Sequence, residues 1–174
     1  EFRRVLFRSA RIPGIFNQAQ IDGWKKTTSA VHAKNAKIFI QLMHTGRVGH
    51  VANLPEGAKI VGSSPIVAAG EMWTDTQGMQ PHPIPYELTT EEVKATIQEY
   101  VTASENAIEA GFDGVELHGA NGYLLEQFLQ SRSNQRTDRY GGSIENRARL
   151  LLEVTQAVVD VWGADRVGVR LSPY

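Results

Sequence analysis

Cysteine is absent from this sequence of 174 residues. Its absence excludes disulfides, thiolate metal sites and a cysteine nucleophile within these residues. An excess of charge of either sign is also lacking, because 18 Lys and Arg oppose 19 Asp and Glu, for a formal net charge of −1. No basic run is long enough to follow a phosphate backbone or an anionic lipid surface. We therefore expect neither nucleic acid nor a membrane as a partner.

Long hydrophobic runs are missing as well. No apolar stretch approaches the roughly 20 residues needed to cross a bilayer, and the N-terminus lacks the continuous apolar region of a secretory signal. With 41% hydrophobic and 21% charged residues, the composition is typical of one ordinary soluble domain or a large piece of one. A reducing cytoplasm is the expected compartment.

The first residues differ in character from those that follow. Residues 1–9, EFRRVLFRS, alternate arginine with bulky apolar side chains and lead into no recognisable turn or cap. We interpret residues 1–10 as a non-native leader. The domain itself is expected to occupy residues 11–174.

Three amphipathic helices are predicted, each starting at a side chain that can accept a hydrogen bond from the first turn. The strongest start is Thr89, because Glu92 follows at the capping-box spacing. Apolar residues then recur at helical spacing in each segment. The predicted helices run from Asn17 to Asn35, from Thr89 to Gly111 and from Ser143 to Gly163.

Short strands alternate with these helices, at residues 37–42, 112–117 and 166–171. This alternation predicts parallel strands joined by right-handed crossovers. One face of each strand is aliphatic and should meet the helices, whereas the other face carries polar groups towards the C-terminal ends. A central strand of an open doubly wound sheet would be apolar on both faces. The pattern therefore favours a (β/α)8 barrel, whose active site lies at that end, with an open sheet as the alternative.

The segment from Thr45 to Leu88 holds five of the seven prolines and shows no regular pattern. Long loops in compact domains are usually functional or disordered. Because this segment follows the C-terminal end of a predicted strand, we expect it to form a lid or a wall of the site.

Three polar residues, Gln41, His118 and Arg170, lie near the ends of three different strands and should converge. An arginine can hold an electron-rich ring, a glutamine amide can pair with the edge of a heterocycle, and a histidine can donate to a carbonyl. Any one of them could instead hydrogen-bond loop backbone. All three together indicate a binding site.

The motif HGANGYLLEQF, residues 118–128, adds Asn121 and Tyr123 after the second strand. A tyrosine stays protonated at neutral pH and can quench a far more basic carbanion. Helical spacing would group Asn121 with His118, whereas extended spacing would group it with Tyr123. Only an irregular loop brings all three to one substrate.

Two other groups of residues are assigned structural roles. The histidines of the long segment match no common zinc spacing and are interpreted as solvated or as loop anchors; they are His44, His50 and His82. The charged run 133–149 could bind an anion, but mutual pairing that fixes the loop is favoured. Its charged residues include Arg136, Asp138, Glu145, Arg147 and Arg149.

Four motifs closely resemble the Old Yellow Enzyme family of flavoprotein ene-reductases. They are IFIQLMHTGRVGH, HGANGYL, RYGGSIENR and GADRVGVRLSPY. The likeness runs from about Arg11 to Tyr174. It implies a (β/α)8 barrel that binds FMN, takes hydride from NADPH or NADH, and reduces a small-molecule activated alkene such as an enone or nitroalkene. The three strands correspond to about strands three to five of that barrel.

The resemblance also implies roles for individual residues. His118 and Asn121 would hydrogen-bond the substrate's carbonyl or nitro oxygen, and Tyr123 would protonate the α-carbon on the opposite face. Gln41 and Arg170 would contact the flavin ring. Met43 lies in the substrate pocket where many relatives have tryptophan, so product stereochemistry does not carry over.

Alternative functions follow from the same motifs. A dienoyl-CoA reductase or amine dehydrogenase-type flavoprotein would add an iron–sulfur cluster. The 174 residues could instead be a catalytically inactive remnant, because three strands cannot close a barrel and the expected phosphate loops follow strands seven and eight. We expect these residues alone to lack bound FMN and activity. The physiological substrate, the choice of NADH or NADPH and the oligomeric state are not predicted.

Overall fold

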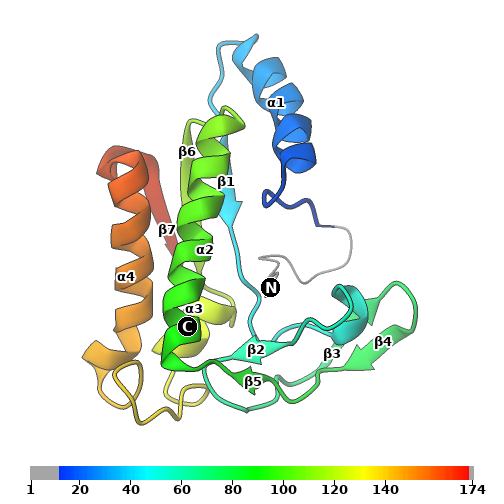
Figure 1. Ribbon diagram of the computed structural model, residues 1–174, viewed down its shortest axis with the longest axis vertical. Helices are drawn as coiled ribbons and strands as arrows, with labels where there is room; N and C mark the ends of the chain where they lie inside the picture. Colours follow the sequence, from blue (N-terminus) through cyan, green and yellow to red (C-terminus); the bar gives the residue numbers. More distant parts are fainter. Residues whose placement is uncertain (1–11, 173–174) are drawn as a thin grey trace.

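The computed structural model describes residues 12–172, so the predicted leader at residues 1–10 lies outside the described residues. A parallel three-stranded sheet with the order β1-β6-β7 forms the centre. Its strands are β1 Phe39–Leu42, β6 Gly114–Gly119 and β7 Val167–Leu171. Because the strands are parallel, their C-terminal ends meet at one edge, which is the lower edge in Figure 1. The predicted α/β class is confirmed.

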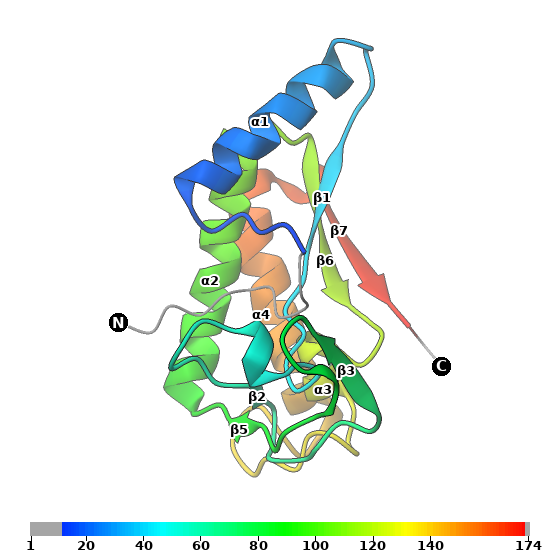
Figure 2. The ribbon, with the colours of Figure 1, turned by 90° about the vertical axis from the view of Figure 1, so that its right-hand side faces the viewer.

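The helices are α1 Gln18–His32, α2 Thr90–Glu109, α3 Leu124–Leu129 and α4 Ile144–Trp162. Figure 2 shows α2 and α4 on one side of the sheet, while no described helix covers the other side. No helix of residues 12–172 is long and apolar enough to cross a membrane.

The predicted helix starts are confirmed by their caps. The Asn17 side chain accepts a hydrogen bond from the Gln20 amide at 3.0 Å. Thr89 and Glu92 form the complete capping box, in which each side chain satisfies a backbone amide of the first turn. The Ser143 hydroxyl accepts from the amide three residues later at 3.3 Å.

The aliphatic face of the sheet packs against the helices on two of the three strands. Ile40, Leu42, Val115 and Leu117 are buried as predicted. The same prediction is wrong for the side chains of Val169 and Leu171 on β7, which are 38% and 58% exposed. β7 is an edge strand of the described sheet, and no described helix lies beyond it to cover them.

Several boundaries differ from those predicted. Helix α1 ends at His32, and Asn35 lies beyond it with a left-handed φ of 55°. Strand β6 begins at Gly114, later than predicted, and Asp113 just before it accepts a side-chain hydrogen bond from the Ile38 amide, which lies just before β1. Helix α3 was not predicted at all.

The segment from residue 45 to 88 is more regular than predicted. It contains the hairpin β3 Glu71–Thr74 and β4 Gly78–Pro81, and the short parallel pair β2 Val61–Gly62 and β5 Tyr86–Glu87. A 3-10 turn, Val51–Asn53, precedes them. Both views place this segment at the C-terminal end of the strands (Figures 1 and 2). Its predicted position beside the site is therefore supported.

Candidate functional site

The face of the sheet that the helices leave open carries the predicted polar residues in neighbouring positions. Gln41 of β1 is paired in register with Glu116 of β6. One level nearer the C-terminal ends, His118 of β6 is paired with Arg170 of β7. Side chains of residues directly opposite in register share one face. The structure thus brings together the three strand-end residues that the sequence singled out.

The His118 ring is buried, and one nitrogen has a defined hydrogen bond. Its Nδ1 accepts from the Ala120 amide at 3.3 Å, which leaves Nε2 to carry the proton in the neutral ring. Burial first, and then the nearby Arg170 guanidinium, lowers the pKa of His118 below its usual value. At neutral pH the ring is therefore a neutral donor through Nε2.

The loop after β6 is irregular, which is the one arrangement that the sequence left possible for a shared site. Asn121 and Gly122 are both left-handed, with φ of 56° and 76°. The chain turns back so that the Tyr123 ring meets the His118 ring edge-to-face, at a centroid distance of 4.9 Å and an angle of 77°. Asn121 lies between these two residues in the sequence, and its side chain is exposed. The Tyr123 hydroxyl makes no hydrogen bond to residues 12–172.

Gln41 is oriented by a residue that the sequence did not single out. Its Nε2 donates to Glu116 Oε1 at 2.5 Å, so the amide plane is fixed on the open face. Arg170 is exposed and makes no hydrogen bond or ion pair within the described part of the chain. The orientation of the Gln41 amide is therefore fixed. The Arg170 guanidinium, one level nearer the C-terminal ends of the strands, is not held by any described residue.

The carboxylate of Glu126 and the hydroxyl of Ser172 also belong to this region. Glu126 accepts from the Gly122 amide and from Ser172 Oγ, and Ser172 Oγ accepts from the Asn121 amide. Sequence reasoning gave Glu126 no role. The available signal was a carboxylate among the apolar residues Leu124, Leu125 and Phe128, four residues after a glycine.

A second buried amide connects the loops that follow β1 and β6. Gln127 Nε2 donates to the carbonyls of Thr45 and Gly122, at 3.0 and 2.8 Å. Its Oε1 accepts from the Arg47 amide at 3.1 Å. A side chain on Gly46 would collide with this amide, at 2.2 Å. The two loops therefore hold a fixed relation to each other.

Met43 and the three histidines of the long segment occupy separate positions. Met43 is half-buried one residue beyond β1, beside a hollow that Gln41 and Phe39 also line. The histidines anchor loops, as one of the two interpretations predicted. His44 and His50 each accept from the amide two residues later, and His82 Nδ1 lies 3.2 Å from the Gly49 carbonyl.

The charged run 133–149 fixes its loop mostly through backbone carbonyls. Arg136, whose side chain is buried, pairs with Asp138 through two nitrogens, at 2.9 and 2.5 Å. This contact holds the pKa of Asp138 down, at about 2. Arg147 and Arg149 instead donate to the carbonyls of Leu129 and of the preceding turn. The predicted mutual pairing is thus correct for Arg136 and Asp138 and wrong for the other two arginines.

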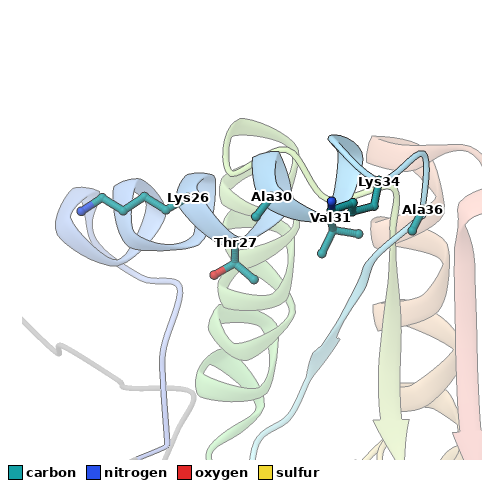
Figure 3. Close-up of a pocket in the computed structure, with 6 residues that line it drawn as sticks. All are labelled: Lys26, Thr27, Ala30, Val31, Lys34 and Ala36. Carbon is teal, nitrogen blue, oxygen red and sulfur yellow. The ribbon is translucent and has the colours of Figure 1, made fainter.

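The hollow drawn in Figure 3 lies elsewhere in the molecule. Residues of α1 and of the turn after it line it, namely Lys26, Thr27, Ala30, Val31, Lys34 and Ala36. This turn leads into the N-terminal end of β1, opposite the edge that carries His118. The hollow contributes nothing to the candidate site.

Residues 8–174 match the model of a protein family described as the NADH:flavin oxidoreductase / NADH oxidase family. The chain belongs to this family. 12-Oxophytodienoate reductase 7 of Oryza sativa subsp. japonica is 49% identical over 164 residues, which are 93% of this chain and 42% of that protein. A probable flavin mononucleotide-dependent alkene reductase of Leishmania infantum is 48% identical over 164 residues, covering 92% of this chain and 45% of its own length. The chain spans less than half of these relatives.

Solved structures of family members superpose closely. Morphinone reductase matches with a TM-score of 0.93 and 44% identity, covering 97% of this chain and 46% of its own. The Old Yellow Enzyme homologue from Zymomonas mobilis matches with a TM-score of 0.92 and 39% identity, covering 97% and 46%. The resemblance to Old Yellow Enzymes that the motifs predicted is confirmed.

The open face can be tested for its fit to FMN, the flavin that the resemblance implies. The Arg170 guanidinium offers five N–H donors and has no acceptor among the described residues. Beside it, a Cβ placed on Gly168 would come no nearer than 3.9 Å to other atoms, so a flat ring could approach the strand there. The fixed Gln41 amide adds a polar edge. These residues fit a flavin ring.

Proposed function

We propose that the intact protein in which this sequence occurs is an FMN-dependent ene-reductase that reduces activated C=C bonds with NADPH or NADH. The observation that carries the proposal is the contact of a neutral, buried His118 with the Tyr123 ring, on the sheet face and at the strand end where Arg170 lies. Family membership alone is not sufficient, since one relative, 49% identical over 166 residues, is named a probable inactive reductase. The proposal therefore rests on the side chains of the candidate site and not on family membership alone.

The proposed site assigns one task to each side chain. The His118 Nε2–H and the Asn121 amide would donate to the carbonyl or nitro oxygen of the alkene and stabilise the developing enolate. The Tyr123 hydroxyl would give its proton to the α-carbon. Met43 would contribute a soft, adaptable wall to the substrate pocket.

The remaining polar residues would hold the cofactor. Arg170 and Gln41 would contact the flavin ring, Arg170 favouring its electron-rich reduced form. When bound, FMN would take hydride from NAD(P)H and pass it to the β-carbon of the alkene. The protein would supply position and electrostatics.

The proposed scaffold is part of one FMN-binding (β/α)8 barrel domain over residues 11–174, with β1, β6 and β7 as strands three to five. Three features support it: the parallel order, the helices on one face only, and the polar open face at the strands' C-terminal ends. Active sites of such barrels lie at that end.

Anaerobic spectroscopy of the purified intact protein tests the function. We expect flavin absorbance near 450 nm that NADPH or NADH bleaches and that cyclohexenone then restores. A protein without flavin, or a reduced flavin that the enone leaves reduced, would overturn the proposal.

A further inference from the structure

One buried carboxylate ties the loop that carries Asn121 and Tyr123 to the end of β7. Glu126, in the first turn of α3, is only 7% exposed. Its Oε2 accepts from the Gly122 amide at 2.5 Å, and its Oε1 accepts from Ser172 Oγ at 3.0 Å. Ser172 Oγ in turn accepts from the Asn121 amide at 3.0 Å. Three hydrogen bonds therefore connect two successive amides of the loop to one carboxylate.

The surroundings of Glu126 make a packing role insufficient. Leu124, Leu125 and Phe128, the apolar neighbours on α3, are fully buried, and an apolar residue would suit this position better than a charge does. A buried carboxylate is costly unless it is hydrogen-bonded. Both oxygens of Glu126 accept hydrogen bonds, which is what the ionised form requires.

The Glu126 carboxylate binds a part of the loop whose backbone conformation no helix or strand stabilises. Asn121 and Gly122 are both left-handed, and their N–H groups point into one acceptor system, as in an anion-binding nest. Neither amide is held by a regular helix or strand. Gln127 holds the Gly122 carbonyl, but without Glu126 the two left-handed amides would lose the acceptors that fix their direction.

The other end of the network lies on the strand of the proposed flavin contact. Ser172 follows β7 directly and is two residues from Arg170, so it shares the open face of that strand. The network thus spans from the substrate-binding loop to the flavin-binding strand.

We propose that Glu126, acting with Ser172, is a positioning residue that sets the distance between the donors of the loop and the flavin-binding strand. It touches neither substrate nor cofactor and acts through the Asn121 and Gly122 amides. This inference rests on the function proposed above.

Substitutions in the intact protein separate positioning from folding. Glu126→Leu removes both acceptors but suits the apolar surroundings, whereas Glu126→Gln keeps one acceptor for Gly122. Ser172→Ala removes the link, and Ser172→Thr retains its hydroxyl. Glu105→Leu is the matched control, because Glu105 is exposed on α2 and makes no hydrogen bond to other residues in the range 12–172.

Each variant is reduced with dithionite and mixed with cyclohexenone in a stopped-flow instrument, so that nicotinamide binding does not enter. We expect Glu126→Leu to slow flavin reoxidation by about 10- to 100-fold, the usual cost of displacing reacting groups by about an ångström, with bound FMN retained. Ser172→Ala should be slowed less, while Glu126→Gln and Ser172→Thr should recover part of the rate.

Two results would overturn the inference while the proposed function stands. Unchanged reoxidation in both Glu126→Leu and Ser172→Ala would show that the network is dispensable. Loss of FMN in the same proportion as loss of rate, with no recovery in Ser172→Thr, would make Glu126 a residue of the fold alone. Failure of the unmodified protein to reduce the enone would instead reject the proposed function and this inference with it.

Discussion

The polar groups at the two ends of the central sheet differ in how fully they are hydrogen-bonded. At the N-terminal end, the Asp113 carboxylate accepts from His32 Nε2, Lys37 Nζ and the Ile38 amide, at 2.8, 2.9 and 2.9 Å. The hydrogen bond from His32, then those from Ile38 and Lys37, holds the pKa of Asp113 well below its usual value. This end joins α1, β1 and β6 through groups that satisfy one another.

At the C-terminal end, Gln41, Glu126 and Gln127 are hydrogen-bonded within the described residues, but other polar groups keep unused donors. Arg170 and the Tyr123 hydroxyl have no hydrogen-bond partner in the part of the chain that the structure describes. The His118 ring has its Nδ1 satisfied and its Nε2–H available. The proposed site requires donors of this kind, because they would have to hydrogen-bond a substrate and a flavin ring. We therefore expect substitutions at the N-terminal end to change stability and substitutions at the C-terminal end to change the proposed chemistry.

The largest effect is expected from removing the proposed proton donor at the C-terminal end. Tyr123→Phe should slow alkene reduction about 10²- to 10⁴-fold, the range for general acid catalysis. FMN content and reduction by NAD(P)H should not change. Stopped-flow reoxidation by cyclohexenone measures the loss.

Tyr86→Phe is the matched control, since Tyr86 lies 40% exposed on β5 and its hydroxyl makes no hydrogen bond to the described residues. It should behave as the unmodified protein does. Undiminished alkene reduction in Tyr123→Phe would remove Tyr123 from the proton-donor role.

A smaller effect separates the side chain of Asn121 from its backbone. Asn121→Gly and Asn121→Ala both remove the side-chain amide. Glycine accepts the left-handed φ of 56° without strain, whereas alanine does not. Both should raise the KM for the enone by up to about tenfold, the scale of one lost hydrogen bond to its neutral carbonyl oxygen. Alanine alone should also lower stability, by about 1 kcal/mol.

Steady-state kinetics and urea unfolding of the two variants test this separation. If Asn121→Gly kept the original KM, asparagine would serve this position only through its tolerance of the left-handed backbone.

The smallest effect on activity is expected at the N-terminal end. Asp113→Asn should lower the urea midpoint at pH 7 and leave enone reduction per bound flavin unchanged. Since the folded-state pKa of Asp113 lies below the unfolded value of about 3.9, its charge stabilises the fold above about pH 4, and this contribution is lost as the pH falls further. The difference in midpoint between the two proteins should therefore shrink from pH 7 to pH 3. A constant difference would mean that the Asp113 charge does not stabilise the fold.

Helix starts were predictable from the sequence because a cap is a local feature. Asn17, Thr89 and Ser143 each bond within four residues of themselves. Helix α3 was missed because its first turn has no side-chain cap at Tyr123, and its six residues are too few for a helical period. The β3–β4 hairpin is not predictable from the sequence, because prolines surround it and its polar turn is typical of a loop.

The convergence of the strand-end residues was predictable, whereas the contacts made by the loop after β6 were not. Parallel strands alone bring His118 beside Arg170. The contact between His118 and Tyr123 depends on two left-handed residues in succession, and only one of them is glycine. Glu126 and Ser172, which meet across 46 positions of sequence, could not be paired by any local spacing.

Phenol binding tests the division between the two ends most directly. A para-substituted phenolate mimics the enolate oxygen, and its charge-transfer absorbance with bound FMN would report occupancy of the proposed His118 and Asn121 donors. The intact protein and Asp113→Asn should bind the phenol with equal affinity, whereas His118→Ala should bind it at least about tenfold more weakly. Equal affinity in all three proteins, or weakening in Asp113→Asn as large as that in His118→Ala, would contradict the assignment of chemistry to the C-terminal end.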